Sequence, residues 1–144
     1  MSAVVTAARI TVSPITPSVG AVVEGVDLKH PLDPETVEGL REAWLERGVL
    51  FFRGQHLDEN TLEAFIGQFG TPITEPSNPS FGAPADAPPV HSGDTGMTKA
   101  VAERWHADAT WLECPPEATA LAMVDLPSVG GDTCWANAAD AYDA

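Results

Sequence analysis

The chain has 144 residues, and 44% of them are hydrophobic, with four tryptophans and five phenylalanines among them. This length and apolar content suffice for one globular domain with a hydrophobic core. The 21 acidic residues against 7 basic ones give a formal net charge of -14, which repels nucleic-acid phosphates and anionic lipid surfaces. We therefore expect neither nucleic acid nor a membrane as a partner. The first residues have no basic n-region, and no apolar run reaches the ~18 residues that span a bilayer, so a cytoplasmic protein is expected.

The strands and helices of the first half are marked by short apolar patterns. Two β-branched runs at 9–12 and 21–26, separated by proline and glycine, predict two strands. A helix is predicted next, with Asp33 as its cap, Pro34 in its first position and Gly48 as its stop. Its apolar residues recur at helical spacing: Val37, Leu40 and Trp44.

A buried strand at 49–52 and a second helix follow. This helix is predicted to begin after the cap Asp58 and to end at Gly70. Its apolar stripe consists of Leu62, Phe65, Ile66 and Phe69. We expect the two helices to cover one face of a sheet.

The second half begins with a proline-rich stretch at about 71–99, which predicts a long loop that is either a lid or a plain connection. Beyond it, 118–124 is apolar enough for a strand, 127–131 has turn chemistry, and 133–135 is predicted to be extended. Asn137 is the expected cap of a last helix. Because a helix that has just begun cannot bury its apolar face, the sequence is expected to continue beyond Ala144.

The two cysteines, Cys114 and Cys134, do not form a CxxC pair, so neither a disulfide framework nor a zinc site is indicated. Free cysteines usually behave as small buried hydrophobic residues. We therefore expect packed or idle thiols.

The residues that could carry chemistry are His106 and Asp108. Two residues apart on an extended strand, their side chains would project to the same face and could bind one metal ion. Imidazole and carboxylate, with one more histidine, form the facial triad of iron(II) oxygenases, which leaves coordination positions open. Taken alone, such a pair is more often an ordinary surface histidine beside an aspartate.

Several further segments in a fixed order change that reading. They are GAVVEGVD at 20–27, VLFFRGQ at 49–55, FGTP at 69–72, WHADATW at 105–111, PP at 115–116, LPSVGGDT at 126–133 and WAN at 135–137. Together they resemble the taurine and 2,4-dichlorophenoxyacetate dioxygenase (TauD/TfdA) family, from about Ile10 to the last residue. The resemblance implies a mainly β fold with flanking helices (α+β), a partial double-stranded β-helix or cupin-like jelly roll whose C-terminal part is missing. Residues 1–144 would be the N-terminal portion of one domain.

The resemblance also implies the site. His106 and Asp108 would bind Fe(II), and the hydroxyl of Thr133 would hydrogen-bond a carboxylate of the co-substrate 2-oxoglutarate. Without that family context, Thr133 would be read as an ordinary residue at the exit of a turn. The complete enzyme would hydroxylate a small organic substrate with O2, releasing succinate and CO2.

Two parts of the family's site, a distal iron-binding histidine and an arginine for 2-oxoglutarate, are expected downstream of this chain. Of the histidines present, His30 and His56 are expected to be solvated, and His91 is a distant candidate for a substitute ligand. A two-ligand site should bind iron weakly. The chain alone is therefore expected to be inactive, with exposed sheet edges and poor solubility.

The substrate is indicated only by departures from the family pattern. Glu75 and Ala102 stand where the taurine enzyme has residues that contact the sulfonate, and Trp111 either lines the pocket or packs in the core. A carboxylate would repel a sulfonate, which argues against taurine and for a non-sulfonate substrate, such as one that bears an amine. The alternative is that Glu75 points to solvent.

The same residues leave two other functions open. A hydrolase or lyase could use His106 and Asp108 as a base pair, but no nucleophile elbow or phosphate loop accompanies them. A non-catalytic remnant or binding fragment of a dioxygenase is the second alternative. A homo-oligomer is left open for a full-length form.

Overall fold

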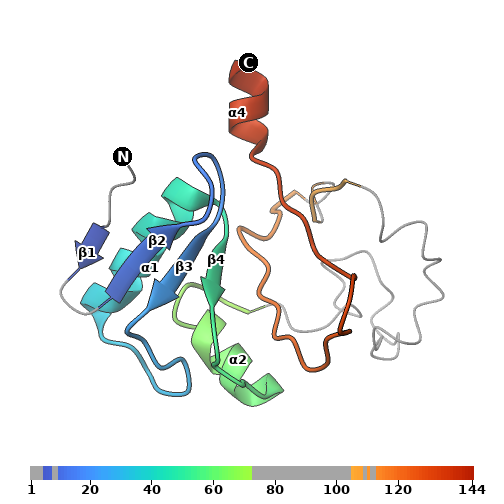
Figure 1. Cartoon of the computed structure of the whole chain (residues 1–144). Coiled ribbons are helices and arrows are strands. Elements are labelled where there is room, and N and C mark those ends of the chain that lie inside the picture. Colours follow the sequence, from blue (N-terminus) through green and yellow to red (C-terminus); the bar gives the residue numbers. More distant parts are fainter. Residues whose placement is uncertain (1–4, 8–9, 73–104, 109, 111–112) are drawn as a thin grey trace. The chain divides into compact units, whose positions relative to one another are not determined.

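The computed structural model describes residues 5–7, 10–72, 105–108, 110 and 113–144. Two compact units divide the chain: residues 1–71 with 122–144, and residues 72–121. In chain order the elements are β1 (Val5–Ala7), β2 (Ile10–Pro14), β3 (Ala21–Glu24), α1 (Pro34–Arg47), β4 (Leu50–Phe52), α2 (Glu59–Ile66) and α4 (Ala138–Asp143) (Figure 1).

The four strands form one mixed sheet in the order β1-β2-β3-β4. The first two pairs are antiparallel, with Val12 opposite Val23, whereas β3 and β4 are parallel, with Val23 opposite Phe52. Parallel neighbours need a crossover connection, and α1 supplies it between β3 and β4. The result is a mixed α/β unit in which α1 lies against the sheet (Figure 1).

The core lies between one face of this sheet and the two helices. Alternate residues of β2 and β3 are buried, as expected for strands with one covered face. On the helix side, Leu40 is fully buried, and the ring of Phe65 meets that of Phe52 edge-on at 5.6 Å between centroids. The buried apolar residues are Ile10, Val12, Ala21, Val23, Leu28, Leu40, Ala43 and Phe65. Both helices therefore contribute to a core on the same face, as predicted.

The caps of the first helix agree with the sequence. The Asp33 carboxylate accepts the Thr36 N–H at 3.0 Å, and this bond satisfies one of the free donors of the first turn. Gly48 ends the helix with a φ of 70° and donates its N–H to the Trp44 carbonyl at 2.7 Å.

The second helix begins after Asp58 as predicted, but it ends at Gly67 and not at Gly70. The residues that follow turn more tightly, because Gln68 and Phe69 donate their N–H groups to carbonyls three residues back. Long-range bonds then hold this turn: Gln68 Oε1 accepts the Leu32 N–H at 2.8 Å, and Arg41 donates to the Phe69 carbonyl at 2.8 Å. Tertiary hydrogen bonds thus replace the last helical turn.

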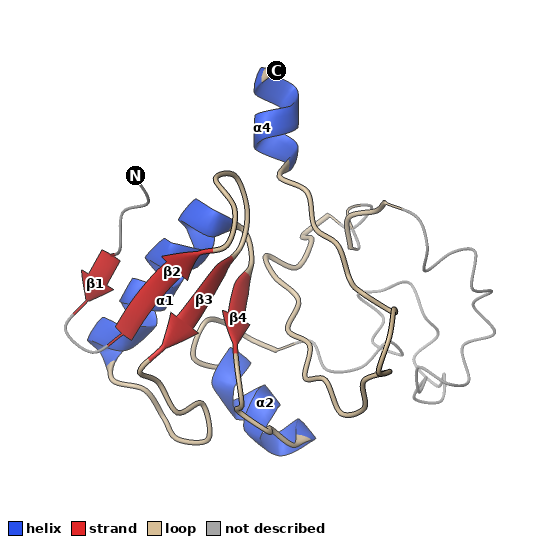
Figure 2. Cartoon of the chain, in the orientation of Figure 1, coloured by secondary structure: helices blue, strands red, loops and turns tan. Residues whose placement is uncertain are grey.

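Three other predictions need correction. The strand β4 is half-buried throughout, not buried. Residues 118–124 and 133–135 form no strand and belong to a long loop (Figure 2). Among the described residues, no neighbouring strand forms hydrogen bonds with them. Both cysteines are free and exposed, which contradicts the packed alternative and leaves the idle one.

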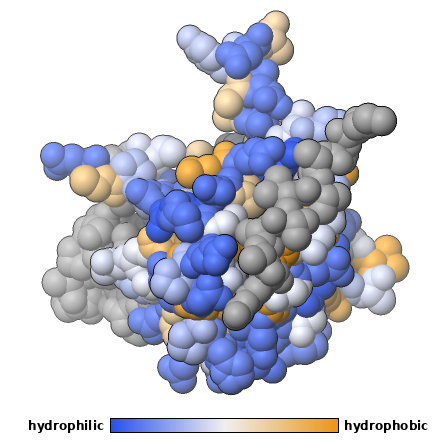
Figure 3. All heavy atoms as spheres, turned by 90° about the vertical axis from the view of Figure 1, so that its left-hand side faces the viewer, coloured by the Kyte–Doolittle hydropathy of each residue, from blue (hydrophilic) through white to orange (hydrophobic). Residues whose placement is uncertain are grey.

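The surface fits the acidic composition. Hydrophilic residues dominate the face that looks out from the side of β1, with small separate apolar spots (Figure 3). More continuous apolar exposure lies along the loop segment: Leu121, Met123, Val124, Leu126 and Val129. In the described part of the chain, no helix is long and apolar enough to cross a membrane.

Leu40→Ala should lower the free energy of unfolding by about 3 kcal/mol, because it leaves a cavity under the sheet. Leu45, on the same helix, is 74% exposed whereas Leu40 is 0% exposed. Leu45→Ala is therefore the matched control and should change stability by no more than about 0.5 kcal/mol. Urea unfolding followed by circular dichroism measures both, and equal losses would contradict the assigned core.

Asp58→Ala should destabilise α2 at pH 7, and the difference from the unsubstituted chain should narrow below about pH 4. The hydrogen bond from the Thr61 hydroxyl, followed by that from the Thr61 N–H, lowers the pKa of Asp58. A folded-state pKa below the unfolded one means that the stabilisation is present above the unfolded pKa and is lost as pH falls through the folded one. Urea unfolding at pH 7 and pH 3 gives the comparison.

Asp58→Asn is the control for this pH effect, since asparagine keeps the capping oxygen but does not ionise. It should retain most of the stability at pH 7. An Asp58→Ala deficit that stays the same from pH 7 to pH 3 would show that the carboxylate charge contributes nothing.

Candidate metal centre

His106 and Asp108 lie in the unit formed by residues 72–121. His106 belongs to neither helix nor strand and Asp108 lies in a turn, so the extended strand expected at this point is absent. The two side chains converge nonetheless: the distance from His106 Nε2 to Asp108 Oδ1 is 3.3 Å. Both are solvent-accessible, with exposed side-chain fractions of 62% and 54%.

The donor set fits a divalent first-row metal. Imidazole nitrogen and carboxylate oxygen bind such ions at about 2.0–2.2 Å, so two donors on adjacent octahedral positions lie about 3.0 Å apart. The observed 3.3 Å between Nε2 and Oδ1 is close to this separation. Within the described residues, no group of three histidine, cysteine, aspartate or glutamate side chains is placed to hold a metal.

The second carboxylate oxygen of Asp108 has a different neighbour. The hydroxyl of Thr119 donates a hydrogen bond to Oδ2 at 2.9 Å, across eleven residues of sequence. The resemblance and the spacing of His106 and Asp108 gave no reason to single out this threonine. Its position in an apolar stretch that was predicted to be a strand was the only available signal.

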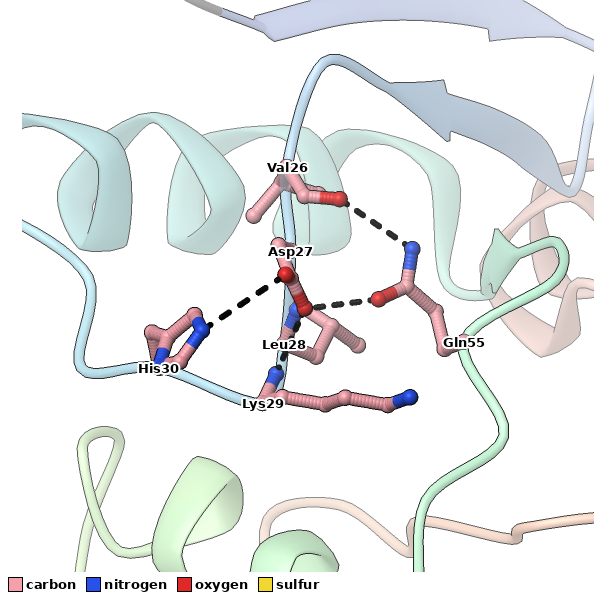
Figure 4. Close-up of polar contacts among 6 residues, drawn as sticks. All are labelled: Val26, Asp27, Leu28, Lys29, His30 and Gln55. Atoms are coloured by element: carbon pink, nitrogen blue, oxygen red, sulfur yellow. Dashed lines mark hydrogen bonds and ion pairs between the residues drawn. The ribbon is translucent and has the colours of Figure 1, made fainter.

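A second histidine–aspartate pair shows what an ordinary one looks like. His30 Nε2 lies 3.8 Å from Asp27 Oδ2, and both side chains are exposed (Figure 4). The other oxygen of Asp27 accepts the Lys29 N–H at 3.0 Å, which makes it part of a local turn. Gln55 holds the same turn, since it accepts the Leu28 N–H at 2.9 Å and donates to the Val26 carbonyl at 3.1 Å. His56 is likewise exposed, as predicted.

Thr133, the predicted 2-oxoglutarate contact, belongs to the other unit and is exposed. It follows the segment 127–131, which bends at Ser128 and Val129 and has φ values of 75° at Gly130 and 74° at Gly131. A Cβ on Gly131 would also lie 3.0 Å from the ring of Pro127. The positive φ therefore favours glycine here, and the close proline ring adds to that preference.

Two contacts on the far side of Thr133 attach this segment to the sheet. The ring of Trp135 meets that of Phe51 edge-on, with 5.3 Å between centroids. Asn137 caps α4 by accepting the Ala139 N–H at 3.0 Å, and its amide Nδ2 donates to the Ser18 carbonyl at 3.1 Å. The cap was predicted from the sequence, whereas the bond to Ser18 was not.

The structure therefore brings together His106 and Asp108 among the predicted site residues. The proposed substrate contacts Glu75, Ala102 and Trp111 lie outside the described residues, as does His91. The same holds for most of the proline-rich stretch at 71–99.

The comparisons with known proteins identify the family. The family described as "Taurine catabolism dioxygenase TauD, TfdA family" matches residues 11–144, so the chain belongs to this family. An alpha-ketoglutarate-dependent sulfate ester dioxygenase of Pseudomonas putida is 38% identical over 94% of this chain and 44% of its own length. An (S)-phenoxypropionate/alpha-ketoglutarate-dioxygenase of Sphingobium herbicidovorans is 35% identical over 92% of this chain and 47% of its own length. The chain thus spans about half the length of these relatives.

A solved structure supports the fold. It is described as a putative alpha-ketoglutarate dependent 2,4-D dioxygenase from Burkholderia xenovorans and is 28% identical. The match has a TM-score of 0.56 and covers 74% of this chain and 35% of that one.

Asn137→Asp should remove the hydrogen bond that attaches the segment carrying Thr133 to Ser18 and should leave the cap of α4 in place. Aspartate caps as well as asparagine but lacks the amide donor that reaches the Ser18 carbonyl. Amide hydrogen exchange at 134–136 should become faster than in the unsubstituted chain. Asn137→Ala should do the same and also lose the helical chemical shifts of 138–143. Unchanged exchange in Asn137→Asp would show that the bond to Ser18 holds nothing.

Proposed function

We propose that this protein is an Fe(II)/2-oxoglutarate-dependent dioxygenase that hydroxylates a small organic substrate. The observation that carries the proposal is the convergence of His106 Nε2 and Asp108 Oδ1 at metal-binding separation in a chain of this family. The names of the relatives supply the co-substrate, since both are described as alpha-ketoglutarate-dependent.

In this proposal each residue has a distinct role. His106 and Asp108 would hold the iron, which when bound would supply the oxidising chemistry. The Thr133 hydroxyl donates a hydrogen bond to a 2-oxoglutarate carboxylate. The balanced reaction converts a substrate C–H bond, O2 and 2-oxoglutarate into an alcohol, succinate and CO2.

The fold and the substrate are finer parts of the same proposal. The sheet would be the first part of a jelly roll within one domain, as the resemblance to the family implies. The substrate would be something other than taurine, with Glu75, Ala102 and Trp111 as its contacts. Relatives named for a sulfate ester and for phenoxypropionate are consistent with a non-sulfonate substrate.

His106→Ala should abolish Fe(II) binding, because it removes one of two donors from an already weak site. His30→Ala is the matched control: it removes an exposed histidine that also lies beside an aspartate, and it should leave binding unchanged. Anaerobic titration with Fe(II) measures both. The ligand assignment is wrong if His106→Ala binds iron as well as the unsubstituted chain does.

The reaction itself is tested by succinate release. A chain of the relatives' length that contains this sequence, supplied with Fe(II), 2-oxoglutarate and O2, should produce succinate, and Thr133→Val should raise the KM for 2-oxoglutarate because a carboxylate partner is lost. Iron binding without succinate for any candidate substrate would favour the non-catalytic reading.

A further inference from the structure

We propose that Thr119 is a positioning residue of the iron site, whose hydroxyl holds one oxygen of Asp108 so that only the other oxygen binds the metal. The proposal rests on the proposed function, because it takes Asp108 as an iron ligand. It adds a residue that touches neither the metal nor a substrate and that acts through the carboxylate alone.

The two oxygens of Asp108 have different partners. Oδ1 lies 3.3 Å from His106 Nε2, on the side where a metal shared with the imidazole would lie. Oδ2 accepts the Thr119 hydroxyl at 2.9 Å. All three residues belong to the unit of residues 72–121, so their arrangement does not depend on how the two units are placed.

This bond restricts how the carboxylate can bind. A carboxylate can bind a metal through one oxygen or through both. With Oδ2 engaged by Thr119, rotation about the Cβ–Cγ bond is restrained, and Oδ1 is presented alone. Binding through both oxygens would take up one of the positions that the proposed reaction needs for 2-oxoglutarate and O2. Thr119 therefore protects an open coordination position as well as the affinity for the metal.

Thr119 is exposed, so water competes for its hydroxyl. The loss of metal affinity on removing this hydroxyl should therefore be small for a hydrogen-bond partner of a metal ligand. Loss of such partners typically weakens metal binding by about 10–100-fold. We expect a factor of about ten here. The contrast with Asp27 is informative: its second oxygen accepts a backbone N–H two residues away, whereas that of Asp108 accepts a side chain eleven residues away.

The test uses Mn(II) alone as the probe and the 144-residue chain. Titration followed by electron paramagnetic resonance gives the affinity, and water-proton relaxation gives the number of waters on the bound ion. Thr119→Val, which keeps the shape but removes the hydroxyl, should bind Mn(II) about tenfold more weakly and carry fewer waters per ion. Thr119→Ser, which restores the hydroxyl, should return both values toward those of the unsubstituted chain.

The controls separate this proposal from the one on which it rests. Thr71→Val makes the same substitution at an exposed threonine of the other unit and should change neither readout.

If Asp108→Ala abolishes Mn(II) binding while Thr119→Val matches the unsubstituted chain, the role of Thr119 is wrong and the iron site stands. If Asp108→Ala binds Mn(II) normally, or the unsubstituted chain binds none, the ligand assignment fails and Thr119 fails with it. If Thr119→Ser weakens binding as much as Thr119→Val, the residue acts by packing and the proposal is overturned.

Discussion

The larger unit depends on the burial of one face of its sheet beneath Leu40 and Phe65. Strand side chains alternate between two faces, so once Val12 and Val23 point to the helices, the register also fixes every other residue. The parallel pairing of β3 with β4 extends the same rule to Phe52, which faces the core. A slip of one residue would reverse all of these positions and expose the apolar set.

That register has a consequence for the opposite face. Because Phe52 points inward, its neighbour Phe51 points away from the helices, where it meets Trp135. The segment that carries Thr133 is thus attached to the sheet through a residue whose direction the core determines. The bond from Asn137 to the Ser18 carbonyl adds a second attachment near the β2–β3 connection. Packing of the core against the helices therefore fixes the direction of Phe51, through which the segment carrying Thr133 is attached to the sheet.

The candidate metal centre depends on a single carboxylate whose two oxygens have different partners. Asp108 offers one oxygen beside His106 and has the other bound by Thr119. Metal ligands generally need such a supporting partner to fix their orientation, and an exposed site needs it more because its side chains are otherwise free to rotate. The smaller unit therefore contains both a pair of donors and a device that orients one of them.

The sequence by itself determined the features whose partners lie within a few residues. The caps Asp33, Asp58 and Asn137 were predictable because each bonds an N–H two or three positions away, and the pair of His106 and Asp108 was recognisable from its neighbouring motifs. The tertiary structure decided what depends on distant residues: the early end of α2, where Arg41 and Gln68 take over the hydrogen bonding, and the absence of a strand at 118–124. It also decided the bonds of Thr119 to Asp108 and of Asn137 to Ser18. These contacts join segments far apart in the chain, so no local pattern of residue types encodes them.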